Sequence, residues 1–313
     1  WLQSKNLVLQ LPRISITMGG QHGIMLSLMV LAKAGDTIAC EGLTYPGLAA
    51  IAMQLGMKVQ GLAMDEQGVL PDALESACKQ NKVRVLYLTP TVQNPTNARM
   101  SKSRRLEILA ITQRFEVKII EDTVSESHID DLSDCFALLA PDSCFSVLSH
   151  SKHLAGGLRV GYLVAPDGYR DKLDQAIRAQ TWSASAMVVE ATQRWLETDV
   201  YQSMIATNRE QLAHRRQWVK QKLEAYGAQV RAASTHVWLP LEEPWRAQDL
   251  QASLLAQGVK VLTAEAFVVG RFPVPQAIRF CLGGVRVQAE FELAINKIAE
   301  QLAQNASARL TIF

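Results

Sequence analysis

Four short polar segments of this chain carry side chains that could do chemistry together. Asp122 lies 28 residues after Asn94, and Lys152 lies 30 residues after Asp122. A lysine amine becomes nucleophilic where burial or a nearby cation favours its neutral form. Asp122 ends an apolar run, so its carboxylate needs a cationic partner or strong hydrogen-bond donors. Arg159, seven residues after Lys152, carries a planar donor fork that suits a phosphate.

The sequence Gly19-Gly20-Gln21 stands at the predicted start of a helix. Free backbone N–H groups and the helix dipole attract anions there, which makes this segment a candidate phosphate cradle. Each feature also has a plain structural interpretation: an ordinary turn for the glycines, a cap for the aspartate, a solvated surface position for the lysine and cover for a sheet edge for the arginine. Neither a G-x-G-x-x-G nor a Walker pattern accompanies them, so the evidence lies in their combination.

The elements that must position these residues follow from the apolar pattern. Helical patterns alternate with short β-branched runs from Gln21 to about residue 164, which favours βαβ units and a mainly parallel, doubly wound sheet. We predict strands at 36–41, 58–63, 83–89, 117–122, 144–149 and 159–164, and helices at 22–33, 47–55, 71–80 and 102–115, with Ser101 as the N-cap of the last. Ligands bind beyond the carboxyl ends of parallel strands, so the polar segments are expected to meet at one edge.

The second half of the chain has fewer and more widely separated strands. Long helices are expected at 168–197 and 199–226, then strands at 236–241, 259–262 and 277–282 and a helix at 285–305. We therefore predict an α/β chain with a large domain at 1–199, which includes the linking long helix, and a smaller α+β domain at 200–313.

Composition excludes several classes of protein. The 313 residues are 48% hydrophobic and 20% charged, with 32 Lys and Arg against 30 Asp and Glu, which indicates an ordinary globular protein rather than a disordered or fibrous one. A formal charge of +2 gives no basic field for nucleic acid. The longest apolar stretch, 24–32, is far shorter than the roughly 20 residues of a membrane span.

Cysteine usage indicates neither disulfides nor zinc. The five cysteines are scattered and form no Cys-x-x-Cys pair, so we expect a reducing, cytoplasmic setting. His150 and His153 flank Lys152, but no third ligand is evident and no metal is expected. The chain begins at Trp1 without a signal peptide, and we expect it to be a fragment that lacks its N-terminal part.

Taken together, these motifs resemble a known superfamily. Asn94-Pro95-Thr96, Asp122, Ser149-His150-Ser151-Lys152 and Gly157-Leu158-Arg159-Val160-Gly161 resemble the fold type I enzymes that use pyridoxal 5'-phosphate, the aspartate aminotransferase superfamily. The segment from Thr89 to Thr96, with Arg104-Arg105 behind it, is most similar to the aminotransferase-like domain of MocR-type transcriptional regulators of the GntR superfamily. The resemblance covers nearly the whole chain and implies a homodimer.

The resemblance implies a role for each matching residue around the cofactor ring. Lys152 matches the lysine that forms the internal aldimine, and Asp122 the carboxylate that pairs with the pyridinium nitrogen. Asn94 matches the amide that donates to the phenolic oxygen O3', and Tyr45 the aromatic side chain that stacks on the ring.

Other residues match the phosphate-binding and substrate-binding positions. The implied phosphate cup comprises Ser149, Ser151, Arg159 and the backbone of Gly20 and Gln21. Arg279 matches the arginine that grips the α-carboxylate of an amino-acid ligand. Its alternative interpretation is an arginine on an edge strand that faces solvent.

Two departures from the family pattern bear on function. The family carries a tyrosine two or three residues after the pyridinium aspartate, where this chain has Val124 and Ser125. The usual Pro-Gly before the phosphate arginine is Gly156-Gly157, which leaves that loop less preorganised. Because the tyrosine is absent, its contact with the cofactor oxygen O3' is expected to be missing.

Two functions from different classes fit these residues. The first is an effector domain that senses pyridoxal 5'-phosphate and an amino-acid or other carboxylate ligand, and that reaches DNA only through a winged helix-turn-helix domain absent from this chain. The second is an α-amino-acid aminotransferase that alternates between pyridoxal and pyridoxamine forms. Fold alone does not decide between them. A degenerate fold that no longer holds the cofactor is a third alternative.

Overall fold

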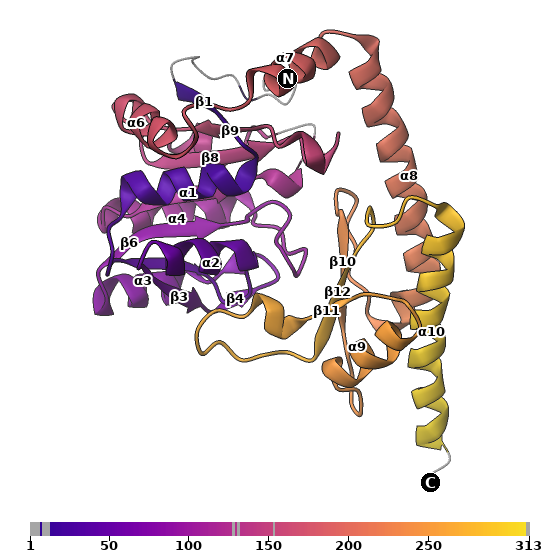
Figure 1. Cartoon of the computed structure of the whole chain (residues 1–313). Coiled ribbons are helices and arrows are strands. Elements are labelled where there is room, and N and C mark those ends of the chain that lie inside the picture. Colours follow the sequence, from indigo (N-terminus) through magenta and orange to yellow (C-terminus); the bar gives the residue numbers. More distant parts are fainter. Residues whose placement is uncertain (1–6, 8–12, 127–128, 130–131, 153, 311–313) are drawn as a thin grey trace. The chain divides into compact units, whose positions relative to one another are not determined.

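The computed structural model describes residue 7 and residues 13–126, 129, 132–152 and 154–310. The chain divides into two compact units (Figure 1). The larger comprises residues 1–94, 98–207 and 269–272, and the smaller comprises residues 95–97, 208–268 and 273–313.

Within the described residues, the larger unit contains a seven-stranded sheet in the order β1-β9-β8-β7-β6-β2-β3. The pairs β2–β3, β2–β6, β6–β7 and β7–β8 are parallel, which confirms the expected mainly parallel sheet. The prediction missed β1 and the antiparallel pairing of β9 with both β8 and β1. The strands of this sheet are β1 (Ile14–Thr17), β2 (Thr37–Glu41), β3 (Lys58–Leu62), β6 (Val83–Leu88), β7 (Lys118–Asp122), β8 (Cys144–Ser149) and β9 (Gly161–Val164).

Helices cover both faces of this sheet because successive strand side chains point to opposite sides. In β2, Ile38 and Cys40 pack with α1, α2 and α6, whereas Ala39 packs with the core built on α3, α4 and α5. Figure 1 shows α1 lying over the sheet. The remaining elements of this part are α1 (Gly20–Leu31), α2 (Pro46–Gln54), α3 (Pro71–Gln80), α4 (Lys102–Arg114), α5 (Phe136–Leu139) and the short pair β4 (Met64–Asp65) and β5 (Gly68–Val69).

Local sequence signals explain where the helices begin. Ser101 caps α4, as predicted, because its side chain accepts a hydrogen bond from the backbone N–H of Arg104. Pro46 occupies the first position of α2, where a missing N–H costs nothing. Gly19 precedes α1 with a φ of 83°, a backbone conformation that glycine adopts without steric cost.

The single helix predicted at 168–197 is wrong, because the structure has two. They are α6 (Arg170–Thr181) and α7 (Ala186–Leu196). Trp182 ends α6 with a φ of 64°, and Ser185 then enters α7 from a non-helical conformation. Positive φ cannot continue a right-handed helix, so the break is local. The next helix, α8 (Asp199–Leu223), is close to its predicted range.

The smaller unit has a three-stranded antiparallel sheet in the order β10-β12-β11 among its described residues. Its core joins side chains of this sheet to those of α8, α9 and α10. The strands are β10 (His236–Pro240), β11 (Leu262–Thr263) and β12 (Ala277–Cys281), and the helices are α9 (Ala247–Ala256), which was not predicted, and α10 (Gln288–Leu310). No helix in the described part of the chain is long and apolar enough to span a membrane.

Candidate functional site

Three of the candidate residues follow strands that lie side by side in the large sheet. Asp122 ends β7, Ser149 ends β8, and Asn94 follows β6. Because β6 and β8 both pair with β7 in parallel, their carboxyl ends lie at the same edge. The expected convergence of these polar strand ends is therefore present in the structure.

Asp122 is a buried charged group at this edge, with 9% of its surface exposed. Its Oδ2 accepts a 2.6 Å hydrogen bond from the Tyr87 hydroxyl, and its Oδ1 accepts one of 2.9 Å from the backbone N–H of Val124. Burial raises the pKa of Asp122, while these two donors and the charge of Lys152 oppose the rise. A cation placed against this carboxylate would offset its desolvation.

Tyr87, which our sequence analysis did not select, is the main side-chain partner of Asp122. It lies on β6 opposite Ile120 of β7, so it shares a face of the sheet with Asp122 two residues further on. It is fully buried, and burial together with the charge of Asp122 raises its pKa well above the usual value. A tyrosine in a strand whose other buried residues are aliphatic was the available signal, because a buried hydroxyl needs a partner.

The Tyr45 hydroxyl interacts electrostatically with two charged residues of the candidate site, Asp122 and Arg159. Burial and the charge of Asp122 raise the pKa of its hydroxyl, and the charge of Arg159 opposes them. Its ring packs against Gly47, where a methyl group would come within 2.3 Å of the ring. The half-buried ring therefore depends on a glycine two residues later.

Arg159 lies against the turn that begins α1. Its Nη2 donates a 3.2 Å hydrogen bond to the carbonyl oxygen of Met18, and a methyl group on Gly19 would lie 2.8 Å from the same nitrogen. Arg159 itself has a φ of 53°, which is uncommon outside glycine. Gly20 and Gln21 form the first turn of α1, where backbone N–H groups have no helical acceptor. An exposed guanidinium and free amides thus meet in a small backbone cradle that suits a phosphate.

Ser149 and Ser151 lie beside each other at the end of β8. Their hydroxyl oxygens are 2.8 Å apart, and the Ser149 hydroxyl donates to the carbonyl oxygen of Val160. Lys152 follows directly, and its side chain is exposed. The amine is accessible to a ligand, and its charge lowers the pKa of Asp122.

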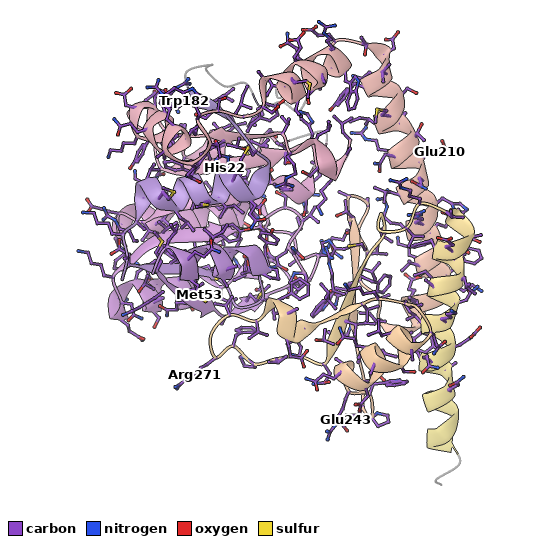
Figure 2. The ribbon with its side chains drawn as sticks, viewed as in Figure 1. His22, Met53, Trp182, Glu210, Glu243 and Arg271 are labelled. Atoms are coloured by element: carbon purple, nitrogen blue, oxygen red, sulfur yellow. The ribbon has the colours of Figure 1, made fainter. Side chains whose placement is uncertain are left out.

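Asn94 supplies a test of whether a ligand fits this site. Its backbone N–H donates to the Thr89 hydroxyl at 3.4 Å, whereas its buried side-chain Oδ1 has no partner in the described part of the chain. Nε2 of His22 on α1 is likewise buried without a partner there (Figure 2). Unsatisfied buried polar atoms are costly and call for a ligand or water. The amide, the cradle and Asp122 therefore fit a group with a polar ring and a phosphate.

Val124 replaces the expected tyrosine and occupies space at the start of α1. A methyl group on Gly20 would lie 2.4 Å from Cγ2 of Val124, so the valine packs directly over that glycine. A valine carries no hydroxyl, so this position supplies no hydrogen bond to a ligand.

Arg279 belongs to the smaller unit, on β12. This strand is central between β10 and β11, and the side chain is half-buried, so the alternative of an edge-strand arginine facing solvent is wrong. Its Nη1 donates to Sγ of Cys281, and its guanidinium lies 6.0 Å from the ring centre of Phe267. Its buried Nε has no partner among the described residues, which leaves a donor for an anion.

The family comparison decides what kind of chain this is. The model of the family described as aminotransferase class I and II matches residues 1–298. The chain belongs to the aminotransferase class I and II family. Pyridoxal 5'-phosphate is the cofactor that membership of this family implies.

Among curated proteins, relatives of this family member include transcriptional regulators. It is 29% identical over 274 residues to the uncharacterized HTH-type transcriptional regulator YdeF of Bacillus subtilis, with 88% of this chain and 59% of the relative covered. It is 28% identical over 262 residues to the HTH-type transcriptional regulator TauR of Rhodobacter capsulatus, with 81% and 53% covered. The chain thus spans between about half and three fifths of the length of these regulators.

Enzymes of the family are also similar to this chain. An aromatic amino acid aminotransferase of Schizosaccharomyces pombe is 28% identical over 202 residues, with 56% of this chain and 42% of that protein covered. Among solved structures, an archaeal alanine:glyoxylate aminotransferase has a TM-score of 0.85 at 24% identity, with 96% of this chain and 78% of that one covered. The α-aminoadipate aminotransferase LysN of Thermus thermophilus has a TM-score of 0.85 at 19% identity, with 98% and 81% covered. These likenesses confirm the fold type I prediction.

Metal-binding side chains do not cluster in the described part of this family member, where no group of three or more His, Cys, Asp or Glu residues could hold an ion. His153, which the sequence analysis considered together with His150, lies outside the described residues.

Proposed function

We propose that the larger unit holds pyridoxal 5'-phosphate, attached covalently through Lys152. The observation that carries this proposal is the buried Asp122 carboxylate, held by Tyr87 and within electrostatic reach of Lys152 and Tyr45. When bound, the cofactor supplies an aldehyde that captures amines and a ring that withdraws electrons. The proposed division is a large cofactor domain at 1–199 and a small domain at 200–313.

The residues of this chain would share the work of binding. Asp122 would keep a proton on the ring nitrogen, Asn94 would donate to the phenolic oxygen through its side-chain Nδ2, and Tyr45 would cover the ring face. The phosphate lies in the cradle made by Gly20, Gln21, Ser149, Ser151 and Arg159. In the smaller unit, Arg279 takes the carboxylate of an amino-acid ligand through its donor fork.

An absorption spectrum before and after borohydride tests the attachment. Borohydride fixes the imine, so peptide mapping should place the modified lysine at 152. Lys152→Ala should lose the visible band and the fixed adduct. Lys118→Ala, which removes a half-buried lysine bonded to the backbone carbonyl of Asp142, should keep both. A wild-type protein without the band, or an unchanged band in Lys152→Ala, contradicts the proposal.

For the whole protein we propose transcriptional regulation through a ligand-sensing domain. Support comes from the HTH-type regulators among its relatives and from the missing tyrosine at Val124. DNA would be bound by a winged helix-turn-helix segment of the complete gene product, in the cytoplasm. A gene product with no such segment before Trp1 contradicts this proposal.

Catalytic transamination is the second candidate function, favoured by the relative named as an aromatic amino acid aminotransferase. Rapid mixing with a panel of amino acids distinguishes an aminotransferase from a ligand sensor. Release of a 2-oxo acid with conversion of the cofactor to its amine form supports an enzyme. A persistent spectral change without release supports a sensor.

We also propose that two copies of this chain pair. Apolar side chains are exposed in the larger unit, among them Trp182 (Figure 2), which is 78% exposed, and Met187. Trp182 and Ile16 line a surface cavity of about 460 Å³. Exposed apolar groups of this size favour an interface, and a second copy is the occupant that fits a homodimeric family. A monomer in sedimentation at micromolar concentration contradicts the pairing.

A further inference from the structure

Glu41 is a buried acid that none of the roles above uses. It ends β2, and only 1% of its surface is exposed. Its Oε1 accepts hydrogen bonds from the backbone N–H of Thr89 at 2.7 Å and from the Thr89 hydroxyl at 3.0 Å. Its Oε2 accepts one of 2.9 Å from the Thr44 hydroxyl. A single carboxylate thus binds two segments that are 45 residues apart in the chain.

Each of these segments leads to a residue proposed to contact the cofactor ring. Thr44 immediately precedes Tyr45, and the Thr89 hydroxyl accepts the backbone N–H of Asn94. The two segments also contact each other, because Nε2 of Gln93 donates a 2.6 Å hydrogen bond to the carbonyl oxygen of Leu43. Glu41 therefore lies where it controls the spacing of the two loops.

We propose that Glu41 is a positioning residue that fixes Tyr45 and Asn94 relative to each other and thereby sets the affinity for the cofactor ring. The inference rests on the proposed function, because it takes these two residues as ring contacts. The claim that Glu41 holds the two loops together concerns the protein without cofactor and does not depend on the proposed function.

The protonation of Glu41 changes this arrangement near neutral pH. Burial raises its pKa to about 7, against the hydrogen bonds from Thr89 and Thr44. The ionisable groups that interact electrostatically with it are Cys40, its neighbour on β2, and Tyr87 on β6. Ionised Glu41 accepts all three hydrogen bonds, and bonds to a charged acceptor are stronger. Neutral Glu41 carries a proton that one of these partners must accept, so the loops are held less firmly.

Glu41→Gln is the informative variant because its amide has the shape of the neutral acid but does not ionise. The matched control is Glu75→Gln, which removes an acid of the same unit that lies on α3 and pairs with the surface side chains of Lys79 and Arg114. Thr44→Val is a second variant, which removes only the bond on the Tyr45 side. It keeps the proposal testable if Glu41→Gln does not fold.

Amide exchange in the protein without cofactor tests the geometric part. At pH 8 the Thr89 and Asn94 amides should exchange about tenfold faster in Glu41→Gln than in wild type, since a charge-assisted bond is lost. The Val85 amide inside β6 should not change, and neither should any of these amides in Glu75→Gln. Equal protection of Thr89 in wild type and Glu41→Gln overturns the proposal.

Cofactor titration between pH 6 and 8 tests the functional part. The ratio of the wild-type affinity to that of Glu41→Gln should rise about tenfold across this range. Using a ratio removes the titration of the cofactor itself from the comparison, because that titration affects both proteins equally. Thr44→Val should weaken binding at pH 8, and Glu75→Gln should follow wild type. A ratio that does not change with pH overturns the inference. A wild type that binds no cofactor while the exchange result holds overturns the proposed function instead.

Discussion

The Tyr87 hydroxyl donates a 2.6 Å hydrogen bond to Oδ2 of Asp122, and both side chains are buried in the larger unit. This bond links neighbouring strands, since Tyr87 lies on β6 and Asp122 ends β7. It holds one oxygen of the carboxylate while the Val124 N–H holds the other. The orientation of Asp122 is thus set before any ligand arrives, which lowers the cost of binding.

Tyr87→Phe should therefore destabilise the protein and weaken its cofactor site. The variant leaves Asp122 one donor short, at a cost of about 1–3 kcal/mol for a buried group. Urea unfolding of the cofactor-free protein measures the loss, and pyridoxal 5'-phosphate titration should show weaker binding. Tyr169→Phe is the control, because this ring contacts Phe145 rather than Asp122. Equal stability of the two variants contradicts the assigned role.

Stability should fall as pH rises from about 4.5 to about 7, in part because the ionised Glu41 carboxylate loses more to burial than it gains from its hydrogen bonds to Thr89 and Thr44. Its folded-state pKa of about 7 exceeds the ordinary 4.5, so the unfolded chain releases the proton first. The contribution is complete below pH 4.5 and lost as pH rises to about 7, amounting to about 3 kcal/mol at most. Urea unfolding at pH 5 and pH 8 measures it. The decline should be smaller in Glu41→Gln, and an identical decline contradicts this pKa.

Gly19→Ala should impair phosphate binding beyond its effect on stability. The new methyl group would displace the Arg159 guanidinium, which lies 2.8 Å from its position. Gly35→Ala is a matched control, because Gly35 also has positive φ but has no atom within 4 Å of the methyl position. Both variants should lose about 1–2 kcal/mol of stability to backbone strain. Only Gly19→Ala should weaken binding of pyridoxal 5'-phosphate, by about tenfold. Equal affinities of Gly19→Ala and Gly35→Ala for pyridoxal 5'-phosphate would contradict the role of Arg159 in phosphate binding.

Arg105→Met should destabilise the larger unit strongly. Arg105 is fully buried, with Nη1 2.8 Å from Oε1 of Glu121 and Nη2 2.6 Å from the Thr91 hydroxyl. Its removal leaves the buried Glu121 carboxylate unpaired, at a cost of about 3–5 kcal/mol. The half-exposed pair of Arg114 and Glu75 is the control, and Arg114→Met should cost much less stability than Arg105→Met. Chemical unfolding measures both, and similar losses would contradict the difference in burial.

Arg279→Gln should reduce affinity for amino-acid ligands while leaving cofactor binding intact. Loss of a bidentate charged contact corresponds to a decrease of about tenfold or more. Calorimetric titration with amino acids and with their amides, which lack the carboxylate, measures the effect. Arg271→Gln changes an exposed arginine and should behave as wild type. A selective loss of cofactor binding in Arg279→Gln would contradict the assignment of this arginine to the ligand carboxylate.

The elements that the sequence predicted well are those encoded by short-range patterns. Helix α4 follows from its capping serine, and β7 from an apolar run that ends in Asp122. Strand β9 begins two residues later than predicted, because Gly156–Leu158 form a short 3₁₀ turn and Arg159 adopts positive φ. Its antiparallel pairing with β1 joins residues about 150 positions apart, which no local pattern encodes.

The sequence by itself determined which polar residues follow which strands, because apolar runs and their polar ends are local features. These features predicted the site edge, and the resemblance of the motifs to a known superfamily implied the family and its cofactor. Tertiary structure decided what holds that edge together: the Tyr87 bond to Asp122, the Glu41 carboxylate between two loops, and Val124 over Gly20. These depend on side chains of different strands meeting inside a packed core, where an unpaired polar group is costly, and only the folded chain brings them together.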